Sequence, residues 1–308
     1  MSAALAIVVS PTAGEGRRLA TEARLRAGLS SGRTAEFLHP GSLAELASMV
    51  HAVAARGDCM LGVAGGDGTI HHVVNALGDR PVALLLIPTG SGNDFCRGLG
   101  VPGNTAAAMR LLEHGVARAV DLIEVNGRRV CTVAGLGIVA DTGVQVARLL
   151  APGSPWRRAG RALGASAYTG AGLLRVAVAR RIAGRATLRW RTAEGSFAER
   201  EGRFHGVFLA NVPTLGAGLR LRVPSRLDDG RLELAILPEA SRARLARGLA
   251  RLSRDRPLPP GVLDVVQTSE VEIVWRGGSA LLGDGEPIDH SDRFHVRVLP
   301  GALRVVAP

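Results

Sequence analysis

The first 125 residues alternate between short apolar runs and longer segments in which apolar positions recur every three or four residues. The apolar runs lie at 5–9, 34–38, 60–64 and 82–87, and the periodic segments at 17–29, 43–56, 69–77 and 106–115. Continuous apolar runs are typical of strands buried on both faces, and the periodic segments of amphipathic helices. The alternation predicts βαβ units, and so an α/β domain with a parallel sheet over 1–125.

The pattern changes from about Val130 onward, where strand-like segments no longer alternate with helical ones. Four later segments are short and rich in apolar and β-branched residues: 202–212, 230–237, 271–275 and 294–299. Gly, Pro and Asp turns separate them, as is typical of antiparallel sheets. We therefore expect a second, β-rich domain over 126–295, built as an antiparallel sandwich or barrel.

An amphipathic segment lies between the two patterns, at 154–181, and carries several arginines. Two interpretations of this segment stay open. It could be a helix that packs on the second domain, or a helix that lies at a membrane surface and meets anionic headgroups.

The composition indicates a folded chain that suits anionic partners. Of the 308 residues 46% are hydrophobic, which suffices for a sizeable core. The chain carries 38 basic and 27 acidic residues, a net charge of +11, and every basic residue is an arginine. Arginine binds phosphate well, so nucleotides, anionic lipids and nucleic acids all fit, although a lysine-free composition could equally reflect the genome that encodes it.

The cysteines and the apolar runs of the sequence indicate the cellular compartment of the protein. Cys59, Cys96 and Cys131 form no CxxC pair, which argues against a disulfide scaffold or a structural zinc site and for a reducing compartment. The N-terminus lacks a basic region, and no apolar run reaches the roughly 18 residues that a membrane helix needs. We expect a cytoplasmic protein whose membrane contact is peripheral.

Three glycine-rich loops follow predicted strands of the first domain: SPTAGEG at 10–16, GGDGT at 65–69 and PTGSGND at 88–94. Loops at the carboxyl ends of neighbouring parallel strands converge in one crevice. Glycine lets backbone amides approach a phosphate, and the N-terminus of a following helix favours negative charge. The three loops therefore predict a nucleotide-binding crevice.

Asp67 stands inside the second loop, where a phosphate would prefer positive charge. The GxxxxGK[ST] loop is excluded because the chain has no lysine, and GxGxxG does not follow the first strand. A carboxylate beside a triphosphate is repelled unless a cation intervenes. Asp67 is therefore predicted to hold Mg²⁺, directly or through water, or to cap the helix that starts near Thr69.

Short polar side chains in the third loop are further candidates. Thr89, Ser91 and Asn93 are suited to phosphate or ribose oxygens, and Asp94 could cap the next helix or contact the nucleotide. In the absence of lysine, neighbouring arginines must neutralise the phosphates. The arginines nearest the loops are Arg17, Arg18 and Arg97.

Two pairs of carboxylates in the second half could also act chemically. In LLGDGEPIDH, Asp284 and Glu286 would project to the same side if the segment were extended, and could serve as a general base and its partner. A hairpin turn would explain the Asp–Gly pair without any function. In RLDDGRLEL, Asp228 and Asp229 fit either a hairpin turn or a metal site.

Taken in order, these motifs resemble the diacylglycerol kinase catalytic-domain family of lipid kinases, which also contains sphingosine, ceramide and bacterial lipid kinases. The resemblance covers nearly the whole chain. It rests on the nucleotide loops GGDGT and PTGSGNDFCR, on SPTAGEG, which resembles the Asn-Pro-x-Ser-Gly-x-Gly opening, and on LDDG, GDGEPI and the ending PGALRVVAP. Each motif alone is modest, but their order is highly specific.

The resemblance implies an N-terminal α/β nucleotide domain completed by 296–308, a C-terminal antiparallel β-sandwich domain, and ATP in the cleft between them. Asp284 would take the proton of the lipid hydroxyl with support from Glu286, and Asp229, with Asp228, would help to hold Mg²⁺. The residues implied to bind the nucleotide are Ser10, Gly14, Gly16, Gly65, Gly66, Asp67, Gly68, Thr69, Thr89, Gly90, Ser91, Asn93 and Arg97.

The sequence departs from the family pattern at a few positions. Ser10 replaces the usual Asn of the opening motif, and His72 stands where the family usually has Glu. Arg17 and Arg18 replace lysines that often follow the first loop. These departures bear on the contacts of the first loop more than on the kinase assignment.

The sequence therefore predicts an ATP- and Mg²⁺-dependent kinase that phosphorylates a hydroxyl of a lipid such as diacylglycerol at a membrane surface. An enzyme that resembles NAD kinases and uses a soluble acceptor would share GGDGT but not PTGSGNDF and DGE. A non-catalytic nucleic-acid-binding protein would explain the charge, but aromatic residues make up only 3%. We expect ATP and lipid as partners, no nucleic acid, and leave a homodimer open.

Overall fold

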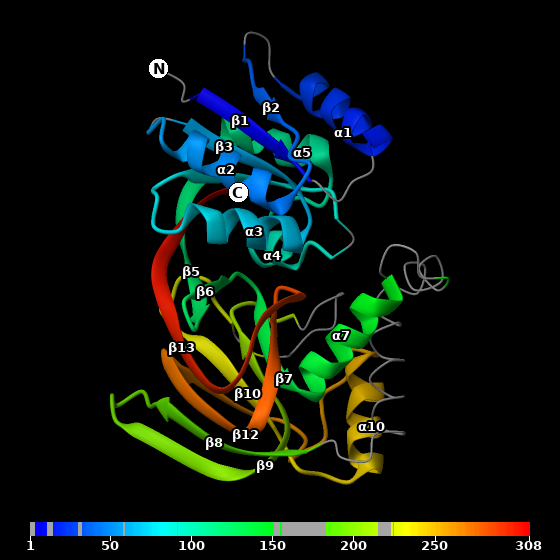
Figure 1. The fold of residues 1–308 in the computed structure, drawn as a ribbon, viewed down its shortest axis with the longest axis vertical. Coiled ribbons are helices and arrows are strands. Elements are labelled where there is room, and N and C mark those ends of the chain that lie inside the picture. The colour runs from blue at the N-terminus through cyan, green and yellow to red at the C-terminus, as the bar shows by residue number, and fades with distance from the viewer. Residues whose placement is uncertain are drawn as a thin grey trace. The chain divides into compact units, whose positions relative to one another are not determined.

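A computed structural model describes residues 4–10, 15–29, 33–57, 59–90, 92–150, 155, 183–214, 223 and 225–308 (Figure 1). The chain forms two compact units, Met1–Leu122 with Pro300–Pro308, and Ile123–Leu299. Almost all of the amphipathic segment at 154–181, together with Gly14 and Ser91, lies outside the described residues. Within those residues, no helix is long and apolar enough to cross a membrane.

The first unit is built on a parallel sheet, which confirms the prediction from the alternating pattern. Its strands run in the order β2, β1, β3, β4, and the end of β13 pairs with β4. Their bounds are β1 Ala4–Val9, β2 Glu36–Leu38, β3 Cys59–Gly65, β4 Ala83–Pro88 and β13 Glu286–Ala307. Five successive residues of β4 are buried, because helices cover a parallel sheet on both faces.

The helices of this unit follow its strands in the chain (Figure 1). They are α1 Glu15–Ala27, α2 Leu43–Ala54, α3 Asp67–Leu77, α4 Asp94–Gly98, α5 Thr105–Met109 and α6 Leu111–His114. In α2, Leu46, Val50 and Val53 are buried at spacings of four and three residues, which places them on one side of the helix. The Ser42 hydroxyl caps α2 by accepting a hydrogen bond from Glu45 N at 3.1 Å.

One predicted helix of the first unit is divided in two. The sequence pattern predicts a single helix over 106–115, but α5 and α6 meet at Arg110. There Glu113 N donates to the carbonyl of Arg110, three residues back, at 3.1 Å. A bond over three residues tightens the backbone to a 3₁₀ turn and interrupts the regular helix.

The second unit is mostly antiparallel, as predicted. Its elements are β5 Val116–Val125, which begins in the first unit, β6 Arg128–Val130, β7 Val133–Gly137, α7 Ile138–Leu150, β8 Gly184–Arg191, β9 Phe197–Ala210, β10 Leu232–Pro238, α10 Arg242–Leu252, β11 Asp264–Thr268, β12 Glu270–Gly283 and most of β13. The pairings of β9 with β7, β8 and β10, and of β12 with β13, are antiparallel. The helices α7 and α10 interrupt a region for which the sequence pattern predicts strands.

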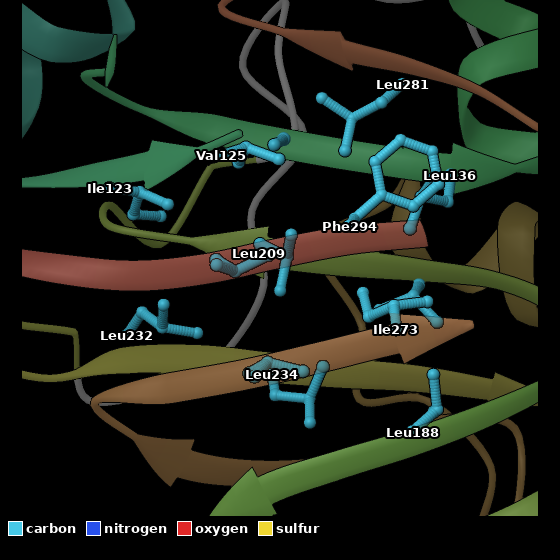
Figure 2. Close-up of a cluster of buried hydrophobic side chains, with 14 of the residues drawn as sticks. Ile123, Val125, Leu136, Leu188, Leu209, Leu232, Leu234, Ile273, Leu281 and Phe294 are labelled. Atoms are coloured by element: carbon cyan, nitrogen blue, oxygen red, sulfur yellow. The ribbon is translucent and has the colours of Figure 1, made fainter. Parts of the chain in front are cut away.

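The core of the second unit is a cluster of buried apolar side chains contributed by most of its strands (Figure 2). In β10, Leu232, Leu234 and Ile236 point into this cluster at every second position, as expected of a strand with one covered face. Phe294 of β13 is among the largest fully buried side chains. Long-range strand pairing around this core holds the β12–β13 turn in place.

Candidate functional site

The three glycine loops of the first unit are tied together at the carboxyl ends of β1, β3 and β4. Ser10 N donates to Ala64 O at 2.9 Å, and Thr89 N donates to Gly65 O at 3.0 Å. The Thr69 hydroxyl donates to Ser10 Oγ at 3.0 Å, and both side chains are buried. The sheet therefore gathers the described parts of the three loops at one edge, where open α/β sheets bind ligands.

Two glycines let the second and third loops approach each other closely. A Cβ atom added to Gly90 would lie 2.6 Å from Gly66 Cα, a distance that no side chain tolerates. A Cβ atom on Gly92 would lie 2.7 Å from Asp67 Oδ2. These positions need glycine because backbone meets backbone or carboxylate there.

Asp67 joins the second loop to the helix that follows the third. Its Oδ2 accepts a hydrogen bond from Asp94 N and its Oδ1 one from Phe95 N, both at 3.1 Å. The prediction that Asp67 caps its own helix is wrong: α3 begins at Asp67 itself, Gly66 is its N-cap, and no side-chain bond caps it. Asp67 instead satisfies amides at the start of α4, which otherwise have no helical partner.

Asn93 shapes the third loop from within. Its backbone is left-handed, with φ of 55°, a conformation that Asn tolerates better than most residues. The side-chain amide donates to Gly90 O at 2.8 Å, and its Oδ1 accepts from Gly90 N at 3.2 Å. Asn93 thus holds the turn at Thr89 and Gly90, both of which are exposed.

Arg97 does not project as an isolated cation. Its guanidinium is paired with the buried carboxylate of Asp94, one turn earlier in α4, while about half of the Arg97 side chain, 49%, stays exposed. An exposed guanidinium that is already oriented by a carboxylate can still meet a phosphate oxygen. Gly16, from the first loop, is exposed within α1, whereas Gly14 and Ser91 are outside the described residues.

Cys96 lies beside this site and is not a nucleophile. Burial and, to a smaller extent, the negative charge of Asp67 together raise the pKa of the Cys96 thiol to about 12. A thiol with so high a pKa stays protonated at neutral pH and is unreactive. Cys96 is therefore no candidate for covalent chemistry at this site.

In the second unit, Asp284 occupies the turn between β12 and β13. Asp284 and Gly285 both have positive φ, 54° and 84°, and they separate the paired residues Gly283 and Glu286. This is a two-residue hairpin turn, for which Asp–Gly is well suited. The segment is therefore not extended, and the premise that Asp284 and Glu286 project to the same side is wrong. Glu286 is half-buried at the start of β13.

The buried Asp284 carboxylate is held by the segment that precedes β7. Its Oδ1 accepts from Thr132 N at 2.7 Å, from the Thr132 hydroxyl at 2.6 Å and from Cys131 N at 3.2 Å. Its Oδ2 lies 2.9 Å from Cys131 N. Asp284 N also donates to Val133 O at 3.0 Å. Several donors of fixed geometry therefore set the orientation of this carboxylate.

A further layer supports the residues that hold Asp284. Asn211 N donates to Thr132 O at 2.7 Å, and the Asn211 side-chain amide donates to Cys131 O at 3.0 Å. Thr132 and Asn211 are 3% and 1% exposed. Sequence reasoning missed both residues. Thr132 lies 152 positions from Asp284, and no local pattern joins them.

The predicted metal ligands are not gathered into a cluster. Asp228 pairs with Arg226 at 3.1 Å, and Asp229 Oδ1 accepts from Arg231 N at 3.0 Å within its own turn. Among the described residues, no three His, Cys, Asp or Glu side chains are grouped so that they could hold a metal ion. Mg²⁺ at nucleotide sites is usually held by one or two carboxylates together with phosphate oxygens and waters. The assignment of Asp67, Asp228 and Asp229 as Mg²⁺ ligands therefore stays a prediction.

Comparison with known proteins agrees with this geometry. Residues 4–125 match the family described as "Diacylglycerol kinase catalytic domain", and residues 173–307 match the "YegS C-terminal NAD kinase beta sandwich-like domain". A "Probable lipid kinase YegS-like" of Pseudomonas aeruginosa is 30% identical over 270 residues, covering 84% of this chain and 80% of the relative. A protein of the same description from Pseudomonas fluorescens is 31% identical over 273 residues, covering 84% and 81%.

A solved structure supports the fold independently. A diacylglycerol kinase from Bacillus anthracis str. Sterne superposes with a TM-score of 0.70 and 18% sequence identity, covering 99% of this chain and 97% of that one. At this identity the likeness concerns the fold. The loops, the turn and the sequence matches to both halves together show that the chain belongs to the YegS-like lipid kinase family, with a diacylglycerol kinase catalytic domain in its N-terminal half.

Proposed function

We propose that this protein transfers the γ-phosphoryl group of ATP to a hydroxyl group of a lipid such as diacylglycerol. The observation that carries the proposal is the buried Asp284 carboxylate, which backbone and hydroxyl donors hold in one orientation at a sharp turn. A general base must be positioned before it can act, and fixed donors provide that positioning.

In the proposed reaction, an Asp284 oxygen accepts the proton of the lipid hydroxyl. The lipid oxygen forms a bond to the γ-phosphorus of ATP, and the bond between that phosphorus and the β–γ bridging oxygen breaks. The products are a phosphorylated lipid and ADP. Such a transfer depends on positioning and on charge stabilisation more than on covalent catalysis.

The glycine loops of the first unit supply the nucleotide contacts in this proposal. Thr89 is exposed in a turn that Asn93 holds, and its hydroxyl group can meet a phosphate oxygen. Arg97 offers positive charge beside this turn. Magnesium would enter with the nucleotide, whose phosphate oxygens commonly bind it, and Asp67, Asp228 and Asp229 remain the candidate protein ligands for it.

The proposal is tested by supplying labelled ATP and neutral detergent micelles that contain diacylglycerol, phosphatidylglycerol, ceramide or a sphingoid base. NAD is supplied as a soluble acceptor in a parallel reaction. We expect label on at least one of these lipids and none on NAD. Label on NAD alone would show an enzyme with a soluble acceptor. Salt-sensitive binding to DNA without transfer to any acceptor would show a non-catalytic binding protein, and either result contradicts the proposal.

A further inference from the structure

The helix α10 and the turn after it form the most one-sided concentration of charge in the described second unit. Residues 242–256 contain six arginines and a single carboxylate, Asp255. Arg244, Arg247 and Arg251 follow one another at spacings of three and four residues, so they lie along one side of the helix. The arginines that are exposed are Arg242, Arg244, Arg247, Arg254 and Arg256.

The apolar side of α10 is already occupied by the protein itself. Leu245 is 5% exposed, and Gly248 is buried against the segment that follows the helix. A Cβ atom on Gly248 would lie 2.9 Å from Val262 Cγ1. The helix is therefore anchored through the side that carries Leu245, and the side that carries the exposed arginines is accessible to a partner.

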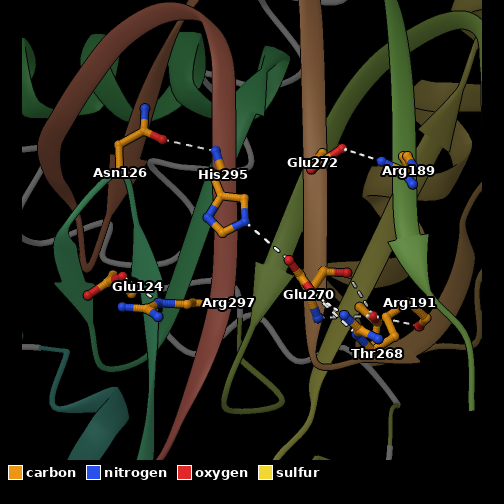
Figure 3. A network of polar contacts seen from close by, with 9 residues as sticks. All are labelled: Glu124, Asn126, Arg189, Arg191, Thr268, Glu270, Glu272, His295 and Arg297. Carbon is orange, nitrogen blue, oxygen red and sulfur yellow. Dashed lines mark hydrogen bonds and ion pairs between the residues drawn. The ribbon is translucent and has the colours of Figure 1, made fainter. Parts of the chain in front are cut away.

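Several arginines elsewhere in the second unit form ion pairs with carboxylates. Along β8, β9 and β12, Arg189 pairs with Glu272 at 3.1 Å and Arg191 pairs with Glu270 at 2.8 Å, in a network that also includes His295 (Figure 3). Further pairs on these strands join Arg200 to Asp264, Arg203 to Glu239 and Arg276 to Glu201. Each of these five arginines therefore has a carboxylate partner.

Three exposed arginines of α10 and the turn after it lack such a match within the described structure. Among the described residues, no carboxylate pairs with Arg244, Arg247 or Arg256. Exposed arginines without internal partners keep their full attraction for external anions. These arginines therefore make α10 and the turn after it a surface with available positive charge.

We propose that the arginine side of α10 docks the protein on an anionic lipid surface. The inference rests on the proposed function, because a lipid kinase must reach a substrate that resides in a membrane. Basic clusters on amphipathic helices are attracted to anionic headgroups, and each arginine brought to the surface strengthens binding about 5-fold. Since α10 is anchored in the protein through the buried Leu245, attachment is electrostatic and reversible, without insertion of the helix.

The test uses the full-length protein with arginines 244, 247 and 256 all changed to glutamine, which keeps a good helix propensity. Binding is measured by sedimentation with vesicles of phosphatidylcholine alone or mixed with phosphatidylglycerol. We expect wild type to bind only the mixed vesicles, less at high salt. The variant should bind them on the order of 100-fold more weakly, given about 5-fold per arginine.

A matched control removes the same charge from paired arginines: Arg189→Gln, Arg203→Gln and Arg276→Gln together. These exposed ion pairs contribute little to stability, and the control should bind mixed vesicles as wild type does. An equal loss in the control would show that binding follows net charge alone and would overturn the assignment to α10. Unchanged vesicle binding by the α10 variant would also overturn the assignment. This includes the case in which the variant loses binding to DNA but keeps binding to vesicles.

Kinase activity separates this inference from the proposed function. In neutral detergent micelles that contain an uncharged acceptor such as diacylglycerol or ceramide, the α10 variant should phosphorylate lipid at the wild-type rate, because no anionic surface is present. Loss of this activity in a folded variant would place the arginines in the catalytic machinery and overturn the docking role. If wild type binds anionic vesicles through α10 but phosphorylates no lipid, the docking inference stands and the proposed function fails.

Discussion

Asp67 and Asp284 are both aspartates in glycine-containing turns, and both accept hydrogen bonds from backbone amides, yet they connect very different parts of the chain. Asp67 reaches amides 27 and 28 residues away, in the next strand–loop–helix step of the same α/β unit. Asp284 reaches amides 153 and 152 residues away, across antiparallel strands that meet only in the folded second unit.

The difference separates two uses of a carboxylate. Both oxygens of Asp67 are engaged at the start of α4, so its main work is to set the geometry of the glycine loops. Both oxygens of Asp284 are engaged as well, but their donors are Cys131 N, Thr132 N and the Thr132 hydroxyl, and Asp284 lies in a hairpin turn and caps no helix. We therefore expect Asp67 to matter for loop structure and Asp284 for the chemical step.

The sharpest test of this comparison is Asp284→Asn. Asparagine has a similar shape but cannot take up the proton of the lipid hydroxyl, so lipid phosphorylation should fall about 10³-fold, within the range of general-base contributions. ATP binding, measured by calorimetry, should be largely retained. Asp292→Asn, at an exposed position of the same strand, is the control and should keep normal turnover. Retained turnover in Asp284→Asn would remove Asp284 as the base.

A smaller effect is expected from Thr132→Val, which deletes the hydroxyl that donates to Asp284 Oδ1 at 2.6 Å. A carboxylate that is less firmly positioned should lower kcat about 10- to 100-fold and leave the KM for ATP unchanged. Thr132→Ser keeps the donor and should restore most of the rate. Equal losses in both variants would indicate a packing role and contradict the positioning role.

Gly90→Ala tests the close approach of the loops in the first unit. The new Cβ would lie 2.6 Å from Gly66 Cα, and since backbone cannot easily move aside, the free energy of unfolding should fall by about 1–3 kcal/mol. The KM for ATP should rise with it. Gly103→Ala is the matched control, because nothing lies within 4 Å of its added Cβ. Similar thermal unfolding of the two variants would show that the loops are not tightly packed.

Asp67→Ala should lower stability less than Gly90→Ala does. It should also distinguish the role of Asp67 from that of Asp284. Loss of a cap for α4 typically lowers the free energy of unfolding by about 0.5–2 kcal/mol. We expect the KM for ATP to rise while kcat changes only a few-fold, measured in the same micelle assay. A fall in kcat as deep as that of Asp284→Asn would instead give Asp67 a direct part in phosphoryl transfer.

The smallest expected effect concerns the cysteines beside the two aspartates. Cys96 lies near Asp67, Cys131 gives its backbone amide to Asp284, and both are buried. Because the pKa of Cys96 is about 12, its thiolate is scarce even at mildly alkaline pH. A thiol-specific dye should therefore label native protein hardly at all and denatured protein fully. Rapid labelling of the native protein would contradict the burial of these sites.

The sequence by itself determined the features that depend on local burial. The alternation of apolar runs and periodic segments predicted the parallel sheet of the first unit, and short strands with Gly and Asp turns predicted the antiparallel second unit. The order of strands and loops also predicted that the glycine loops would meet at one sheet edge. These predictions succeed because periodicity reports which face of each element is covered.

Only the tertiary structure decided which groups meet. Strand register places Thr132 against Asp284. The close approach of two loops lets Asp67 bind amides of α4 and not those of its own helix. The packing of α10 on Val262 leaves most of the arginines of α10 exposed. Hydrogen-bond partners that lie far apart in the chain leave no periodic trace. They depend on distances that exist only after the strands have paired. The sequence pattern therefore predicts candidate site residues, and only the fold determines their hydrogen-bond partners.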